Sequence, residues 1–309
     1  MIKIIAGRLL QLIPVLWIIL TLTFFMSKSV PGGPFSAERQ ATPEVIARLN
    51  AYYGLDKPLW EQYTGYLSKV VRFDFGPSYT YQGESVNEVI ARSFPISLQI
   101  GTLAFVISLL LGIPAGVIAA VNRNTVLDYV PMSLSMLGIC LPTFVLGPLF
   151  ALVFGLIFKL APVNGWYGLN YMPLHPMVVP ALTLGLFYAA YVARLTRGGM
   201  LDILNQDFIR TARAKGVPEH EIILKHALRG GLLPVASFLG PAFAGLLSGS
   251  FVLEKVFNVP GIGQEFIKSV FNRDYPLILG TVAFFGVLIV LFNLLSDVLQ
   301  AWMDPKSRS

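Results

Sequence analysis

Long, uniformly apolar runs of about 20 residues recur along this 309-residue chain. A helix of that length crosses the hydrocarbon core of a bilayer, which is about 30 Å thick. The runs lack the polar and apolar alternation that lipid-facing β-strands show. Hydrophobic residues make up 55% of the chain and charged residues only 13%, whereas soluble domains are about 45–50% apolar. The sequence therefore predicts an all-α integral membrane protein.

We expect six transmembrane helices. They fall at about residues 9–27, 96–121, 130–158, 177–196, 234–253 and 278–301. The first run resembles a secretory signal, but its apolar core is long and the following SKSVPGGPF contains no convincing cleavage site. We therefore expect it to be retained as a span. The single cysteine, Cys140, excludes an internal disulfide and a cysteine-based metal site.

Basic residues indicate the orientation of these spans. With both termini inside, the inner segments hold twelve basic residues and the two short outer loops hold four. This bias predicts cytoplasmic termini, because short cytoplasmic loops are enriched in lysine and arginine. The net charge of +6 is then a property of the cytoplasmic loops, and we expect no nucleic-acid partner. Asp297, near the inner end of the last span, is more plausibly a capping or snorkelling residue than a functional one.

The segment between the first two spans, about residues 28–94, is rich in aromatic residues and turn signals. The stretch TPEVIARLNAYYG predicts a helix with Thr42 as N-cap, Pro43 at its first position and Gly54 closing it. We expect a small extracytoplasmic domain here. The chain would then divide into residues 1–94, the first span with this domain, and residues 95–309, a core of five helices.

A charged stretch, RTARAKGVPEHEIILKHALRGGLLP at residues 210–234, interrupts the apolar sequence between the fourth and fifth spans. It predicts two short helices, the first ending at Gly216 and the second running from Pro218 to Gly230–Gly231. Four residues of the first helix and the sequence before it share one predicted apolar face: Leu201, Leu204, Phe208 and Ala212. A loop that only fixes topology needs a few basic residues, not two capped helices with an apolar face. We therefore favour a docking element for a partner protein.

This stretch resembles the EAA loop of permease subunits from binding-protein-dependent ABC importers. In that pattern Ala212 matches the second alanine, Gly216 the glycine four positions later, and Leu233–Pro234 the closing residues. Arg210 stands in place of the acidic residue and Thr211 in place of the first alanine. These departures, with the long gap to Pro234, are typical of the peptide and nickel branch of the family.

The resemblance extends over nearly the whole chain. It includes SVPGGPF at 29–35, YGLDKPLWEQY at 53–63, DFGPSY at 74–79, VPGIGQ at 259–264, NRDYPL at 272–277 and DPK at 304–306. Within the branch, these motifs are most similar to the B-type membrane subunits of bacterial oligopeptide permeases.

The resemblance implies a bacterial inner-membrane permease that forms half of a pathway for oligopeptides. The loop at about residues 200–234 would be a coupling element seated in a groove of a cytosolic ATPase subunit. Its implied docking residues are Phe208, Arg210, Thr211, Ala212, Arg213 and Gly216. The chain contains no G-x-x-x-x-G-K-[ST] phosphate loop, so we expect no cofactor in it. ATP and Mg²⁺ would bind to two ATPase subunits, alongside a paralogous permease and an extracytoplasmic peptide-binding protein.

Other functions stay open at this stage. Importers of dipeptides or haem, glutathione and nickel belong to the same branch, and the sequence does not identify the residues that line the pathway. An intramembrane protease is a remote alternative, because Ser78 lies in a G-x-S-x pattern. However, His220 and His226 are expected across the membrane from Ser78, and nothing in the sequence brings His175 near it.

Overall fold

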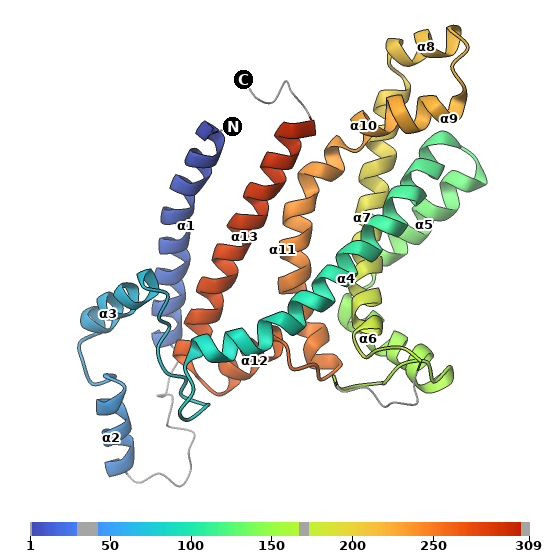
Figure 1. Ribbon diagram of the computed structural model, residues 1–309. Helices are drawn as coiled ribbons and strands as arrows, with labels where there is room; N and C mark the ends of the chain where they lie inside the picture. The colour runs from blue at the N-terminus through green and yellow to red at the C-terminus, as the bar shows by residue number, and fades with distance from the viewer. Residues whose placement is uncertain (1, 30–42, 167–172, 304–309) are drawn as a thin grey trace.

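The computed structural model describes residues 2–29, 43–166 and 173–303, and within them helices are the only regular elements (Figure 1). The helices are α1 (Ile2–Ser29), α2 (Pro43–Tyr52), α3 (Leu59–Val71), α4 (Val86–Val121), α5 (Val126–Cys140), α6 (Thr143–Phe150), the π-helical η1 (Ala151–Ile157), α7 (Val178–Leu204), α8 (Asp207–Ala214), α9 (Glu219–Glu221), the π-helical η2 (Ile222–Ala227), α10 (Leu228–Gly231), α11 (Leu233–Val256), α12 (Ile262–Phe271) and α13 (Tyr275–Met303).

Four of the described helices are long and apolar enough to cross a membrane: α4, α7, α11 and α13. A fifth candidate is the pair formed by α5 and the α6–η1 segment, which is bent by 104°. The apolar part of α1, Ile13–Ser29, is shorter. The all-helical membrane class is therefore confirmed, whereas the full set of six spans stays a prediction.

The expectation of one continuous helix across residues 130–158 is wrong. The helix breaks at Leu141, whose backbone is extended (φ −85°, ψ 121°), and a new helix follows Pro142. The physical reason is the proline ring, which disfavours helical geometry at the preceding residue. Hydropathy alone could not reveal the break, because the sequence is apolar on both sides of it.

Helix α4 begins ten residues before the expected start of the second span at residue 96. Ser85 and Glu88 form a capping box: Ser85 Oγ accepts from the Glu88 amide at 3.3 Å, and Glu88 Oε2 accepts from the Ser85 amide at 2.7 Å. The helix continues through Pro95 and Pro114 to Val121. The expected division between residues 94 and 95 therefore falls inside α4, and it stays a prediction.

The core of the bundle is built on the contact between α4 and α7. A Cβ atom at Gly112 would lie 2.7 Å from the Ala189 carbonyl oxygen, and one at Gly116 would lie 2.5 Å from that of Ala193. Glycines thus let the two backbones approach closely, as small residues do in membrane helix pairs. The beginning of α5 is also fixed to α7, because the Arg197 guanidinium donates to both oxygens of buried Asp128 at 2.6 and 2.7 Å.

Helices α2 and α3 lie at the opposite end of the bundle from α8 and α9 (Figure 1). The predicted helix at Pro43–Tyr52 is confirmed, and Gly54 follows it with a φ of +67°; Thr42 lies outside the described residues. Helix α3 packs on α1, where Tyr63 and Thr21 share a hydroxyl hydrogen bond of 2.7 Å. The start of α1 and the end of α13 lie at the same end as α8 and α9 (Figure 1).

Candidate functional site

The docking element predicted from the charged stretch comprises α8, the turn at Gly216, and the continuous helical run α9–η2–α10. Its first helix begins later than expected. Helix α7 continues to Leu204, and Gln206 then adopts an extended backbone (φ −79°, ψ 154°) before α8 starts at Asp207. The prediction of one apolar face across residues 201–212 is therefore wrong for Phe208, because the break changes the rotation of α8 relative to α7.

The turn after α8 is a Schellman motif centred on Gly216. The Gly216 amide donates to the Arg213 carbonyl at 3.0 Å, and the Val217 amide donates to the Ala212 carbonyl at 3.2 Å. Gly216 has a φ of +78°, which disfavours any residue with a side chain. The predicted end of the helix at Gly216 and the start of the next after Pro218 are both confirmed.

One side of the docking element is fastened to the membrane helices. Ile209 of α8 and Ile222 of η2 are both 0% exposed, and they share a buried cluster with Met200 of α7 and Ala120 of α4. Leu201, Leu204, Ala212 and Val217 pack against the same cluster. Sequence reasoning missed Ile209; its signal was an isoleucine beside Phe208 on a short helix that otherwise carries charged and small residues.

The helical run α9–η2–α10 also lies close to α7. A Cβ atom at Gly199 would lie 2.2 Å from the Gly231 carbonyl oxygen, so only glycine fits there without displacing the backbone. Gly230 and Gly231, expected only to end a helix, therefore pack against Ile203 and Met200 of α7. Both halves of the docking element therefore contact α7.

The other side of the docking element is open. Phe208 is 47% exposed, and the Arg210 side chain is 72% exposed. Arg213 makes two hydrogen bonds to Glu219, at 2.6 and 3.1 Å, which join α8 to α9 across the turn. These bonds hold the pKa of the Glu219 carboxyl below its ordinary value. The Thr211 hydroxyl donates to the Asp207 carbonyl oxygen at 3.0 Å within α8.

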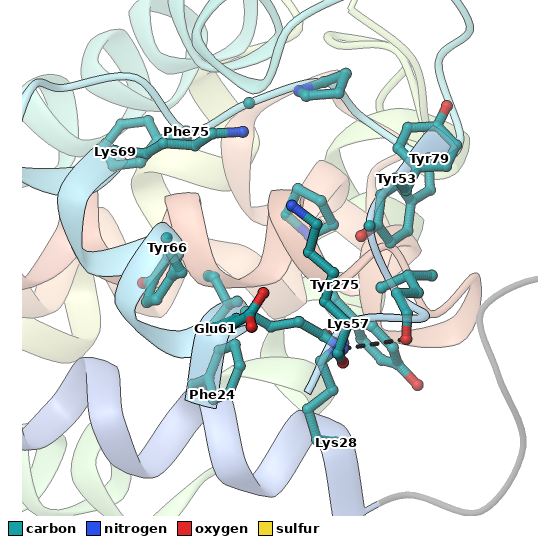
Figure 2. A pocket seen from close by; sticks show the side chains of 18 of the residues that line it. Phe24, Lys28, Tyr53, Lys57, Glu61, Tyr66, Lys69, Phe75, Tyr79 and Tyr275 are labelled. Carbon is teal, nitrogen blue, oxygen red and sulfur yellow. Dashed lines mark hydrogen bonds between the residues drawn. The ribbon is translucent and has the colours of Figure 1, made fainter. Parts of the chain in front are cut away.

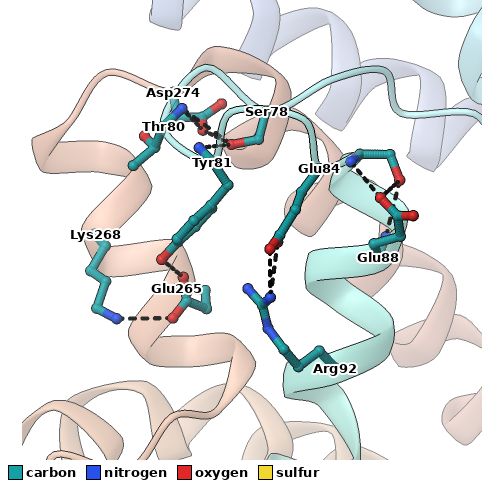
Figure 3. A network of polar contacts seen from close by, with 10 residues as sticks. Ser78, Thr80, Tyr81, Glu84, Glu88, Arg92, Glu265, Lys268 and Asp274 are labelled. Carbon is teal, nitrogen blue, oxygen red and sulfur yellow. Dashed lines mark hydrogen bonds and ion pairs between the residues drawn. The ribbon is translucent and has the colours of Figure 1, made fainter.

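Ser78, the remote protease candidate, is a structural residue at the other end of the bundle. Its side chain is 1% exposed, and its hydroxyl donates to Asp274 Oδ2 at 2.5 Å (Figure 3). The same carboxylate accepts from the amides of Tyr79 and Thr80, and its other oxygen caps α13 at the Leu277 amide. The motifs DFGPSY and NRDYPL thus meet at Asp274, and no histidine that the structure describes is hydrogen-bonded to Ser78. His175 instead packs on Trp166.

The VPGIGQ motif surrounds a second buried carboxylate. Glu254, at the end of α11, is 1% exposed and accepts hydrogen bonds from the amides of Gly263 and Gln264 at 2.8 and 3.1 Å. Ser250 donates to its other oxygen at 2.7 Å. The carboxylate satisfies two amides in the first turn of α12, so the motif fixes the junction of α11 and α12 at the end of the bundle opposite α8 and α9 (Figure 1).

Comparison with known proteins supports the resemblance. Residues 112–309 match the family described as binding-protein-dependent transport system inner membrane component, and residues 1–101 match its N-terminal membrane component. The chain belongs to this family. The permease is 46% identical to the oligopeptide transport system permease protein OppB of Haemophilus influenzae and 47% identical to that of Escherichia coli K12, over 308 residues and the full length of both chains. It is 45% identical to the dipeptide permease DppB of Bacillus subtilis over 94% of this chain and 92% of that one.

Solved structures share the fold of the permease. A chain of the inward-facing MetNI methionine ABC transporter matches 70% of the permease and 96% of its own length, with a TM-score of 0.57 and 16% identity. A chain of an amino acid ABC transporter with histidines gives a TM-score of 0.53 at 18% identity, covering 70% and 94%. The permease is therefore a multi-pass inner-membrane transport subunit, and its relatives are permeases rather than enzymes. Transport systems of this family also contain ATPase and substrate-binding components.

Proposed function

We propose that this permease is the membrane subunit of an ATP-driven importer of oligopeptides. The assignment of oligopeptides as the substrate rests on the 46–47% identity, along the whole chain, with proteins named oligopeptide permeases. Dipeptides are the second candidate substrate, because the dipeptide permease of Bacillus subtilis is 45% identical over nearly the whole chain.

The permease has six spans with both termini in the cytoplasm. In this topology α1 crosses the membrane, and α5 with α6–η1 crosses it as one broken span. The arrangement is supported by the position of the start of α1 and the end of α13 at the same end as α8 and α9 (Figure 1). It is also supported by the concentration of basic residues in the same segments.

The α8–α10 element docks in a groove of a cytosolic ATPase subunit. Phe208 enters the groove as the apolar anchor, while Arg210 and Arg213 supply charge at its border. The element has a buried side and an exposed side, which supports this role. Ile209 and Ile222 are fully buried against α4 and α7, whereas Phe208 is 47% exposed. Movement of the ATPase would then displace α7 and α4 together with the docking element.

The complete transporter contains a paralogous permease, two ATPase subunits and an extracytoplasmic peptide-binding protein. Each permease lines half of the pathway. ATP and Mg²⁺ bind to the ATPase subunits, and this chain has no cofactor of its own. The support is the family membership, together with the absence of a phosphate-loop motif from the sequence.

Uptake of a radiolabelled pentapeptide and a radiolabelled dipeptide into vesicles tests the proposal. The vesicles carry the permease with all four partner subunits, and parallel preparations each lack one. We expect ATP-dependent pentapeptide uptake only in the complete set, with dipeptide uptake at least tenfold slower at equal concentration. Faster dipeptide uptake would select the second candidate. Uptake or ATP hydrolysis by the permease alone would contradict the proposal.

A further inference from the structure

A pocket opens at the end of the bundle where α3 packs on α1 (Figure 2). Its volume is about 290 Å³, near the lower end of the range for small-molecule sites, and it suits one amino-acid residue. The walls come from α1, the segment at residues 52–57, α3, the loop at residues 75–79 and the start of α13. Six of its aromatic side chains are those of Phe24, Tyr53, Tyr66, Phe75, Tyr79 and Tyr275 (Figure 2).

The charges around the pocket favour an anion. Three lysines line it, Lys28, Lys57 and Lys69, against one acidic residue, Glu61. Lys57 and Lys69 make no ion pair with any residue that the structure describes. Lys28 is held in place by Gln62 Oε1 at 2.6 Å, with its ammonium 5.3 Å from the centre of the Tyr275 ring.

Tyr66, a residue that lines the pocket, carries a further donor in its buried hydroxyl. The Tyr66 hydroxyl is buried and has no hydrogen-bond partner among the described residues. A buried donor of this kind is destabilising unless an acceptor reaches it. The Tyr66 ring stacks on Phe24 at 5.8 Å between centroids, which holds the ring in place. Ammonium groups, this hydroxyl and aromatic faces are together suited to a carboxylate attached to an apolar or aromatic group.

We propose that this pocket binds the carboxyl-terminal residue of a short peptide on the extracytoplasmic side. The lysines contact the terminal carboxylate, and the tyrosine and phenylalanine rings contact the terminal side chain. The proposal rests on the proposed import of peptides and goes beyond it, because it assigns to the permease itself a site that senses the free carboxyl end. Peptides with an amidated end would lack the charge that the site binds.

The test measures equilibrium binding to the full-length permease in nanodiscs of zwitterionic lipid. The probes are N-acetyl-L-phenylalanine and its uncharged amide, which differ only in the carboxylate. We expect the acid to bind at least about tenfold more tightly than the amide, since hydrogen bonds to a charged group are stronger than those to a neutral one. Lys57→Gln and Lys69→Gln should each weaken binding of the acid several-fold. Lys255→Gln, an exposed lysine that does not line the pocket, should leave it unchanged.

Tyr66→Phe provides a second variant, because it removes the hydroxyl and keeps the ring. This variant should lower the affinity for the acid several-fold without changing the affinity for the amide. Equal affinity for the two probes, or an equal loss in the Lys255 variant, would overturn the proposal. Displacement of the acid by phosphatidylglycerol, with the same lysine dependence, would assign the pocket to a lipid headgroup and also overturn it. Peptide uptake is measured separately. A pocket that does not bind the carboxylate would therefore leave the proposed import function unaffected.

Discussion

Two adjacent residues of α8 have opposite surroundings. Ile209 is 0% exposed and packs in the cluster with Met200 and Ile222, whereas Phe208 is 47% exposed. An aromatic ring that is left half-exposed on a short helix at the end of the bundle is available to a partner. The structure thus separates a residue that fastens the docking element to this chain from one available to bind another chain.

Alanine substitutions at these two positions should therefore have different effects. Ile209→Ala should lower the free energy of unfolding of the docking element by about 2–5 kcal/mol, because it leaves a cavity. Phe208→Ala should leave permease stability within about 0.5 kcal/mol and weaken ATPase binding by about 2 kcal/mol or more. Thermal unfolding of the purified permease and the affinity for purified ATPase subunits separate the two effects. A Phe208→Ala variant that binds ATPase normally would contradict the docking role.

Asp274 is another single residue that joins two segments, the loop at Ser78 and the start of α13. Asp274→Ala leaves the amides of Tyr79 and Thr80 without this acceptor and removes the α13 cap. We expect a loss of about 2–4 kcal/mol of unfolding free energy, from an unsatisfied buried donor and a lost cap. Chemical denaturation measures it, with exposed Asp56→Ala as the control. An equally small effect of both substitutions would show that Asp274 does not hold the loop.

Among the elements, the turn at Gly216 fixes the angle between α8 and α9. A Cβ atom there would have open space, so only its φ of +78° penalises a side chain, by about 1–2 kcal/mol. Gly216→Trp should therefore leave the spans inserted while it distorts the docking element. We expect normal membrane abundance, weakened co-purification of the ATPase subunits and loss of peptide-stimulated ATP turnover.

Gly198→Ala is the matched control for this substitution, because Gly198 on α7 also has open space but an ordinary φ. It should retain co-purification and ATP turnover. If Gly216→Trp behaved like Gly198→Ala, the stretch would serve only as a topology loop.

The Arg213–Glu219 pair is the second link between α8 and α9. A double-mutant cycle with Arg213→Ala and Glu219→Ala should give a coupling energy of about 0.2–1 kcal/mol, because both side chains are half-exposed. The folded pKa of Glu219 is lowered, so this contribution is fully present above the ordinary carboxyl pKa of about 4.3 and is lost as pH falls through the lower folded value. Denaturation of the four proteins at pH 7 and at low pH measures it. A coupling energy that grew on acidification would contradict the assignment.

The sequence predicted those elements whose signals are local. Gly216 and Pro218 marked a turn that the backbone adopts, and Pro43 and Gly54 bounded α2. The break at Leu141 and the extended Gln206 were not predicted, because the apolar pattern continues across both. The environments of Ile209, Asp274 and Gly199 depend on contacts between distant segments, and no periodicity encodes such contacts.

For the whole molecule, the orientation in the membrane determines whether α8 can reach a cytosolic partner. In a Cys140→Ser background, Thr64→Cys should react with an impermeant thiol reagent in intact cells, because Thr64 is an exposed position of α3. His220→Cys should react only after permeabilisation, because the proposed topology places α9 in the cytoplasm. Labelling of position 220 in intact cells would invert the topology and remove the coupling role. Ser78 is a poor reporter, because it is buried.

Photocrosslinking from Phe208 tests directly whether α8 contacts an ATPase subunit. Phe208→p-benzoylphenylalanine in the assembled transporter, irradiated in membranes, should form a covalent adduct with an ATPase subunit. The same photoreactive residue in place of Thr64, at the opposite end of the bundle, should form none with that subunit. Adducts from position 208 only with lipid or with the permease itself would contradict the claim that this loop couples ATP hydrolysis to transport.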